Sequence, residues 1–277
     1  MQRMEESTIS FPTLYAILDW SMLLGGLAVS VLVLRHHHRN PPDREQCTAT
    51  ILQRAWPTRA MGILLCCILL VYLLASATGQ FFYEEQLPLV RLVATLLIYL
   101  ALVAAIFTIN RQRGLSREDA FGIGPGRTKA LACSPLLYLA IIPFLMVATK
   151  GYHAMLHYWL GQEITMQDAA QAIAQETSWL EAGYILAAIV VAPVYEELLF
   201  RGILFPYLAK RIGMAGSIAI VSILFALIHF HVPSIMPLFL LSTALCLAYW
   251  RTGSLWTSIG IHATFNAVGT LAIKLAY

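Results

Sequence analysis

The stretch Val194-Tyr195-Glu196-Glu197-Leu198-Leu199-Phe200-Arg201 places two adjacent carboxylates and an arginine inside an apolar run, residues 185–208. A run of about 20 mostly apolar residues is long enough to cross a bilayer as a helix. A charge at bilayer depth costs between about 2.5 and 17 kcal/mol, depending on how the cost is determined. Such charges usually mark a functional site, so the stretch predicts a transmembrane helix that carries one. The alternatives are a soluble loop and an ion pair that only holds helices together.

The composition of the whole chain favours the membrane interpretation. Of its 277 residues, 59% are hydrophobic and 12% are charged, and the mean hydropathy is +0.71. Soluble domains carry about 25% charged residues, so this chain has too few for a water-exposed surface. The net charge of +3 is modest and spread over several loops. Nucleic-acid binding, which needs a concentrated basic surface, is therefore excluded.

The cysteines indicate no redox or metal site. Their number is odd and no C-x-x-C pair occurs, which argues against a disulfide framework and a zinc knuckle; they are Cys47, Cys66, Cys67, Cys133 and Cys246.

About eight apolar segments are long enough to be membrane spans, and no β pattern or internal repeat interrupts them. The predicted fold class is therefore all-α and polytopic. The segments are residues 14–34, 61–77, 89–109, 131–148, 185–208, 215–230, 234–250 and 255–273. We predict a single membrane domain over residues 1–277. It divides into an N-terminal four-helix part (14–150), an interfacial segment (151–183) and a C-terminal four-helix core (184–277).

The segments between the spans predict an orientation. Lysine and arginine concentrate in cytoplasmic loops, and residues 35–60 and 111–130 are basic, whereas residues 78–88 and 151–183 carry mainly acids. The basic loops are therefore expected in the cytoplasm, and the protein in the inner membrane of a bacterial cell. We expect residues 35–59 to form a solvated loop, residues 122–126 a turn, and residues 151–183 one or two amphipathic helices on the membrane surface.

The sequence predicts a local ion-pair partner for only one of the two glutamates in the opening stretch. Glu197 and Arg201 are four residues apart, the spacing of an ion pair on one helix face. Glu196 points about 100° away from Glu197 on the helix and has no local partner. A desolvated carboxylate of this kind can act as a general base toward water.

Two later helices supply further polar groups. Phe225 precedes His229 by one turn and can pack behind its ring, and His262 precedes Asn266 by one turn. Polar groups inside a bilayer must find one another or a water-filled cavity. The three helices could therefore hold a water molecule, or a metal bound by Glu196, His229 and His262.

Hydrolysis by activated water fits these residues best. Neither H-E-x-x-H nor G-x-S-x-G occurs, and no cysteine lies near a histidine in these helices, so serine and cysteine nucleophiles have little support. Glu196 would activate the water and His229 would share it. His262 and Asn266 would donate hydrogen bonds to the oxyanion that develops on an acyl or peptide carbonyl.

The motifs Glu196-Glu197-x-x-x-Arg201, Phe225-x-x-x-His229 and His262-x-x-x-Asn266, the last preceded by residues 253–256 (GSLW), resemble the CPBP family of intramembrane proteases. This family is also called Abi or CAAX prenyl protease type II. The resemblance covers about residues 182–277.

The resemblance implies an eight-helix intramembrane endopeptidase. It implies a catalytic role for Glu196, His229, His262 and Asn266, and a supporting role for Glu197, Arg201 and Phe225. It also leaves open a glutamate mechanism without cofactor and a metal-dependent mechanism, with zinc as the possible metal. The implied partners are the lipid bilayer and a membrane-associated protein or peptide substrate.

Two other functions remain open from the sequence. A non-catalytic scaffold, immunity factor or maturation factor could retain the same pocket. A proton-coupled transporter also uses buried acids and histidines, although here these residues cluster in one region and do not run from one face to the other. The loop sequences do not indicate which substrate is cut: prenylated CAAX proteins, bacteriocin precursors and other membrane peptides are all compatible with them.

Overall fold

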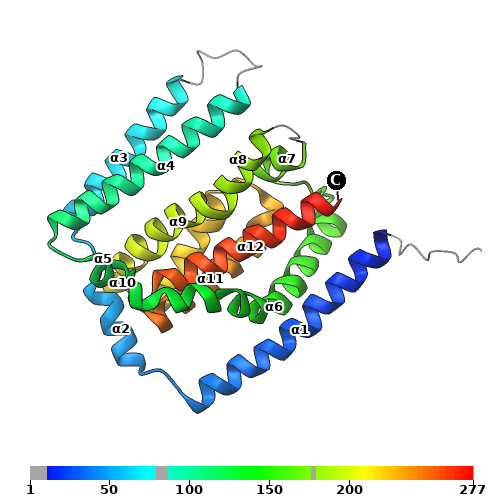
Figure 1. Ribbon diagram of the computed structural model, residues 1–277, viewed down its shortest axis with the longest axis horizontal. Coiled ribbons are helices and arrows are strands. Elements are labelled where there is room, and N and C mark those ends of the chain that lie inside the picture. Colours follow the sequence, from blue (N-terminus) through cyan, green and yellow to red (C-terminus); the bar gives the residue numbers. More distant parts are fainter. Residues whose placement is uncertain (1–10, 79–86, 176–178, 277) are drawn as a thin grey trace, which may run out of the picture.

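The computed structural model describes residues 11–78, 87–175 and 179–276 (Figure 1). All regular structure in these ranges is helical, which confirms the predicted all-α class. The longer helices are α1 (Phe11–Arg39), α3 (Thr58–Thr78), α4 (Leu87–Gln112), α6 (Thr128–Leu160), α10 (Phe205–Leu227), α11 (Ile235–Thr252) and α12 (Leu255–Ala276). The shorter ones are α2 (Arg44–Gln53), α5 (Arg117–Phe121), α7 (Asp168–Gln175), α8 (Leu180–Leu186) and α9 (Ala192–Glu197).

Four helical segments of the described residues are long and apolar enough to cross a membrane. They are Pro88–Gln112, Thr128–Leu160, Leu180–Leu227 and Val232–Thr252. The third has 48 residues, and Gly213 breaks it with non-helical backbone angles (φ 76°, ψ 170°). That break falls between the predicted segments 185–208 and 215–230. The membrane class is thus supported, while the count of about eight spans stays a prediction.

Two expectations for the polar segments need correction. Residues 35–59 are not a loop, because α1 continues to Arg39 and Asp43 caps a further helix, α2, by accepting hydrogen bonds from the Glu45 and Gln46 amides. The sequence reading missed α2 because it is short and polar. Residues 122–126 are non-α as expected: Gly122 ends α5 in the left-handed region (φ 68°), and a short 3-10 helix begins at Pro125.

Residues 151–183 also differ from expectation. Helix α6 continues through Pro143 and Gly151 to Leu160, where Gly161 ends it in a left-handed conformation (φ 61°), the usual helix-terminating role of glycine. Between Gly161 and Glu181, α7 is the one complete helix of the described residues, and its placement on the membrane surface stays a prediction. The acidic residues Glu84 and Glu85 of segment 78–88, and Glu176 of segment 151–183, lie outside the described residues.

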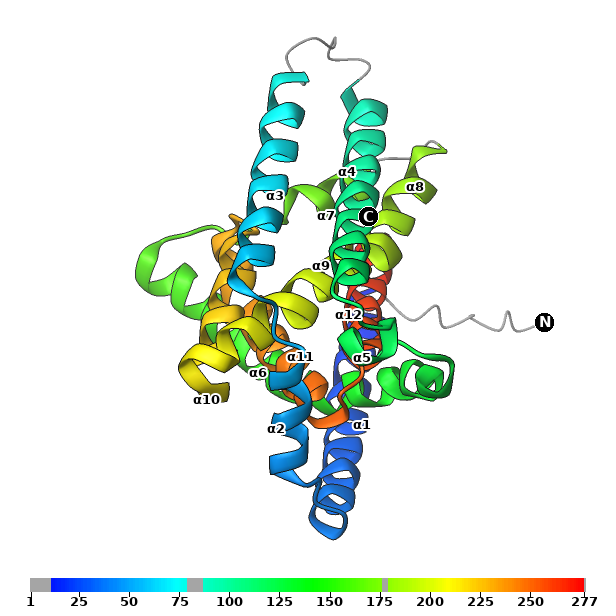
Figure 2. The same ribbon diagram turned by 90° about the vertical axis from the view of Figure 1, so that its left-hand side faces the viewer.

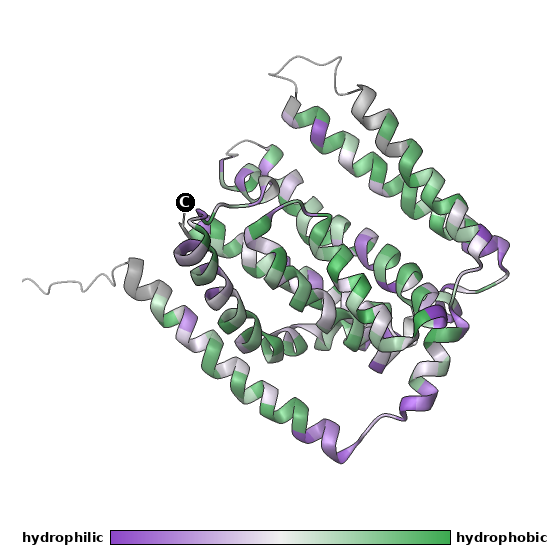
Figure 3. Cartoon of the chain, turned by 180° about the vertical axis from the view of Figure 1, so that it is seen from behind, coloured by the Kyte–Doolittle hydropathy of each residue, from purple (hydrophilic) through white to green (hydrophobic). Residues whose placement is uncertain are grey.

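The helices fall into neighbouring groups. α3 and α4 lie side by side and extend beyond the other helices (Figure 2). α6 packs between α1 and the pair α11 and α12. Most turns of the long helices consist of hydrophobic residues (Figure 3). Leu65, Leu69, Leu97 and Leu100 are among those whose side chains are exposed, as a lipid-facing surface requires.

Three basic segments meet at one end of the molecule, around Gly253. Arg54, which directly follows α2, donates hydrogen bonds to the Gly253 carbonyl (2.8 Å) and the Tyr249 hydroxyl (2.9 Å). Arg127 donates to the Gly253 carbonyl as well (3.2 Å), and Arg113 reaches the Ala55 carbonyl (3.2 Å). The basic segments around residues 54, 113 and 127 therefore share one side of the protein with the end of α11.

Candidate active site

The helix that carries Glu196 and Glu197 is irregular on both sides. Helix α9 lies between two π-helical segments, η4 (Ala187–Val191) and η5 (Leu198–Leu204). In each, a backbone N–H reaches five residues back: Ala192 to the Ala187 carbonyl, and Phe205 to the Phe200 carbonyl. Such segments are rare and often occur at functional sites.

A proline directly follows each of these wide turns. Pro193 and Pro206 lack a backbone N–H, and a proline ring clashes with the carbonyl four residues earlier in a regular α-helix. A turn that is one residue wider gives the chain a way to continue as a helix past the proline. The two prolines are thus the local sequence feature that accounts for the irregular geometry around α9.

Glu197 lies at the centre of a buried polar network. Its Oε1 accepts a hydrogen bond from Arg201 Nη1 (2.8 Å) and lies 2.9 Å from Nδ1 of His262. The side chains of Glu197 and Arg201 are 0% exposed, and that of His262 is 4% exposed. The ion pair predicted for Glu197 and Arg201 is therefore present, and His262 joins it from α12.

Arg201 also ties the site to α11. Its Nη2 donates to the Ser242 hydroxyl (2.6 Å) and to the Ser242 carbonyl (3.2 Å). The sequence reading missed Ser242, although a serine within an apolar span was a usable signal. Four helical segments, α9, η5, α11 and α12, thus hold one polar network.

Glu196 differs from Glu197 in its contacts: Oε1 of Glu197 is bonded to Arg201 and His262, whereas the Glu196 carboxylate makes no hydrogen bond among the described residues. Oε2 is buried without a partner in both acids. The nearest cationic group is His262, whose Nε2 lies 3.8 Å away, and the Glu196 side chain is 14% exposed. Because Nδ1 of His262 faces Glu197, its Nε2 faces Glu196, and the one ring bridges the two acids.

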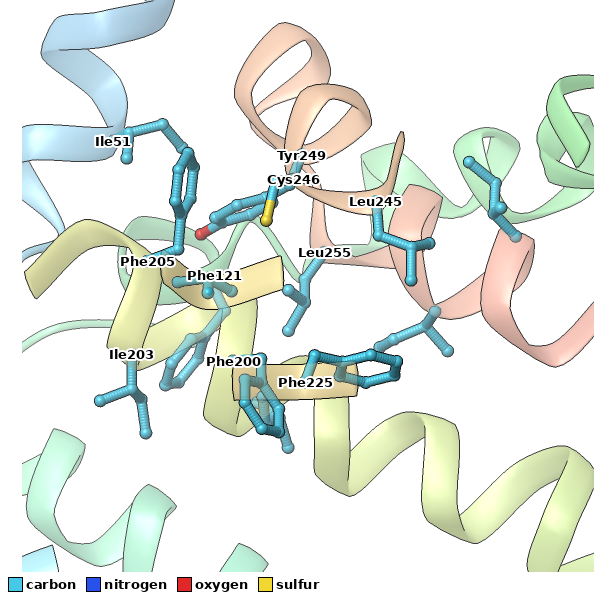
Figure 4. Close-up of a cluster of buried hydrophobic side chains, with 14 of the residues drawn as sticks. Ile51, Phe121, Phe200, Ile203, Phe205, Phe225, Leu245, Cys246, Tyr249 and Leu255 are labelled. Atoms are coloured by element: carbon cyan, nitrogen blue, oxygen red, sulfur yellow. The ribbon is translucent and has the colours of Figure 1, made fainter. Parts of the chain in front are cut away.

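The Phe225 ring lies close to both histidines and to Arg201. Its centroid lies 5.1 Å from the His229 ring and 5.6 Å from the His262 ring, and the Arg201 guanidinium lies 4.6 Å above it. Phe200 packs edge-on against the same ring (Figure 4). Both predicted histidines therefore share one aromatic neighbour, although they come from different helices.

His229 has a defined orientation. Its Nδ1 lies 2.7 Å from the Phe225 carbonyl, and a carbonyl can only accept, so Nδ1 carries the hydrogen. In the neutral ring Nε2 is then the acceptor. This tautomer suits a group that accepts a hydrogen bond from water.

Asn266 does not contact His262 directly in this structure. Its Nδ2 donates to the Ala188 carbonyl in η4 (2.7 Å), so it links α12 to the irregular segment before α9. The amide has a second hydrogen on Nδ2 that this bond does not use.

A cavity of about 200 Å³ lies beside this network. Tyr99 of α4, which stacks on Tyr195 at 4.7 Å, lines it together with Ala188. The full lining is Arg91, Leu92, Thr95, Tyr99, Ala172, Ile173, Tyr184, Ala187, Ala188 and Ala192. The cavity therefore borders Tyr99, which stacks on the Tyr195 ring next to Glu196 in the chain. It also borders Ala188, whose carbonyl accepts the hydrogen bond from Asn266.

In a metal-dependent mechanism, Glu196, His229 and His262 are the residues that would hold a zinc ion. Among the described residues, no three His, Cys, Asp or Glu side chains gather in an arrangement that could hold a metal ion. Glu196, His229 and His262 therefore do not form such a group in this structure. Nδ1 of His262 instead faces Glu197, and Nδ1 of His229 donates to the Phe225 carbonyl.

Comparison with known proteins gives one match. Residues 178–268 match the family model described as "Type II CAAX prenyl endopeptidase Rce1-like", which confirms the resemblance inferred from the motifs over that part of the chain. No curated protein and no solved structure matches. The matched range contains Glu196, Glu197, Arg201, Phe225, His229, His262 and Asn266. With the apolar helices, the match identifies an integral membrane protein.

Proposed function

We propose that this protein is an intramembrane endopeptidase that hydrolyses a peptide bond near the membrane surface with water activated by Glu196 and His229. The observation that carries the proposal is the unequal state of two adjacent acids. Glu197 is buried and pairs through Oε1 with Arg201 at 2.8 Å and His262 at 2.9 Å, while the contact of the neighbouring Glu196 is a longer one, 3.8 Å to Nε2 of His262. The match to a CAAX endopeptidase family supports this choice of reaction.

The reaction proceeds through one water molecule. Glu196 accepts a proton from that water as the water oxygen bonds to the substrate carbonyl carbon. Nε2 of His229 accepts the other water hydrogen as a hydrogen bond and orients the nucleophile. When the carbon–nitrogen bond breaks, the proton held by Glu196 passes to the leaving amine.

His262 stabilises the developing oxyanion when it is protonated on both nitrogens. Its Nδ1–H then donates to Glu197, and its Nε2–H is available to the substrate oxygen. With a protonated His262, the charges of Glu196, Glu197, Arg201 and His262 sum to zero. A neutral group of charges is favoured in a site of low dielectric constant, where unpaired charges are costly. The second hydrogen on Nδ2 of Asn266 completes the oxyanion site.

The substrate class we propose is a membrane-associated protein or peptide, and a prenylated CAAX protein is its leading member. A lipid-modified peptide would reach the site from the bilayer, and the cavity lined by Tyr99 and Ala188 lies beside it. We place the protein in the inner membrane of a bacterial cell, with the basic segments around Gly253 on the cytoplasmic side.

Substrate capture tests the proposal. A Glu196→Ala variant carrying a photo-crosslinking residue at the cavity rim should trap an uncleaved substrate, and mass spectrometry should map the bond that the wild-type protein cuts. Glu163→Ala, at an exposed acid outside the site, is the matched control and should trap none. A prenylated CAAX peptide in liposomes is the first candidate to assay with purified protein.

Two outcomes would favour the alternatives. If Glu196→Gln restored function in a deletion strain, the protein would act as a scaffold, immunity factor or maturation factor. If proteoliposomes took up a solute with protons while no peptide was cut, it would act as a transporter.

A further inference from the structure

A second cavity, remote from the glutamates, lies between α1, α6 and α11. Its volume is about 450 Å³, and none of the seven predicted site residues lines it. The lining is mostly apolar: Ser30, Val33, Leu34, His37, Leu137, Ala140, Ile141, Phe144, Ala244, Leu247, Ala248, Arg251, Thr252 and Ile261. The proposed protease reaction makes no use of this cavity.

This cavity forms an apolar groove beside a line of close contact between α1 and α6. The Ser30 hydroxyl is 2.6 Å from the Ala140 carbonyl, and a side chain at Gly26 would overlap the Leu139 carbonyl and the Pro143 ring. Beyond this line, Leu34 and Phe144 are both 63% exposed. An apolar rim of this kind faces lipid in a membrane protein.

The end of the groove is basic. A neighbouring cavity of about 300 Å³ is lined by His37, Pro41, Pro42, Arg44 and Arg251. It shares His37 and Arg251 with the apolar groove, so the two cavities are adjacent. An apolar slot thus opens onto a pocket with two arginines.

These arginines have no acidic partner within the described part of the chain. The ion pairs found there involve neither Arg44 nor Arg251. The Nε of Arg251 is buried without a hydrogen-bond partner among the same residues, while its Nη1 approaches the ring nitrogens of His37. Both guanidinium groups lie over the Trp250 ring, at 6.0 and 5.9 Å. The pocket therefore brings together two guanidinium groups that form no ion pair among the described residues.

We propose that this composite site binds an anionic glycerophospholipid. The phosphate lies between Arg44, Arg251 and His37, and an acyl chain lies in the groove along α6. Basic pockets between membrane helices recognise anionic headgroups in this way, and guanidinium–phosphate hydrogen bonds are strong because both partners are charged. The bound lipid joins α1 and α2 to the end of α11.

Native mass spectrometry of the full chain, released from detergent with added lipid, tests the site. We expect phosphatidylglycerol to bind at least about tenfold more tightly than phosphatidylcholine, since each arginine near an anionic lipid contributes about 1 kcal/mol. The double variant Arg44→Gln/Arg251→Gln should lose this preference. Lys129→Gln, at an exposed lysine outside both cavities, is the matched control and should retain it.

Two further arms identify what is bound. Ala140→Trp fills the groove without changing charge and should also weaken phosphatidylglycerol binding, so the test does not depend on the arginine variants folding. Inorganic phosphate should not displace the lipid. The proposal is wrong if both lipids bind equally, if folded variants of either kind bind as the wild type does, or if inorganic phosphate competes fully.

Discussion

At the scale of single residues, one carboxylate oxygen determines how the site is arranged. Oε1 of Glu197 holds Arg201 at 2.8 Å and His262 at 2.9 Å. Sequence spacing predicted the first contact, since both residues lie on one helix four positions apart. It did not predict the second, because it assigned His262 to Glu196 and nothing in the spacing relates α9 to the rotation of α12.

We expect Arg201→Gln to destabilise the protein strongly. Removing one partner leaves Glu197 charged and buried, at a cost of about 3–5 kcal/mol in the free energy of unfolding. Glu197→Gln/Arg201→Gln removes both charges and should recover most of that loss. Chemical unfolding in detergent micelles gives both values. A single-variant loss below about 1 kcal/mol would show that the pair does not stabilise the fold.

Asn266→Ala separates two roles of one amide. As an oxyanion donor, Asn266 should lower kcat by about 10²- to 10³-fold when removed, and that is the result we expect. If Asn266 served only to hold the Ala188 carbonyl, the loss would be that of one neutral hydrogen bond, roughly tenfold or less. Steady-state cleavage rates decide between these values, with KM followed to separate binding from chemistry.

At the scale of elements, α9 illustrates what local sequence leaves out. Pro193 and Pro206 mark places where a regular helix is disfavoured, yet a proline can kink, end or widen a helix. Packing selects among these outcomes. Here Asn266 bonds to η4 and Arg201 of η5 bonds to Ser242, so contacts from α11 and α12 accompany the wide turns.

The contact between α1 and α6 gives a matched pair of variants. A Cβ at Gly26 would lie 2.7 Å from the Leu139 carbonyl oxygen, whereas a Cβ at Gly25 meets nothing within 4 Å. Gly26→Ala should therefore push α1 from α6, and its amides from residue 27 to 39 should exchange hydrogen faster. Gly25→Ala should exchange as the wild type does. Equal exchange in both variants would contradict this packing.

At the scale of the whole molecule, composition and periodicity predicted the class, and contacts supplied what they lacked. The all-α class and the break near Gly213 were visible in the sequence, because apolar runs and their interruptions are local. Helix α2 was not visible, since a short polar helix has little periodic signal. The extension of α6 to Leu160 was not visible either, because the sequence after Ala148 becomes less hydrophobic. The meeting of three basic segments at Gly253 depends on long-range contacts that no local pattern contains.

This meeting of basic segments predicts the orientation of the chain. In a background without the native cysteines, Arg39→Cys should react with a membrane-impermeant maleimide only after cells are opened. Glu163→Cys, on the acidic segment, should react in spheroplasts that are intact. The reverse pattern would contradict the cytoplasmic placement of the basic side.

The account depends most on Glu196 as the base. Glu196→Gln preserves shape and removes the basic oxygen, so we expect the cleavage rate of a mapped substrate in liposomes to fall by about 10²- to 10⁴-fold, with unfolding unchanged. Glu163→Gln should cleave at the wild-type rate. If folded Glu196→Gln cleaved at a rate within about tenfold of wild type, Glu196 would not be the base and the proposed mechanism would be wrong.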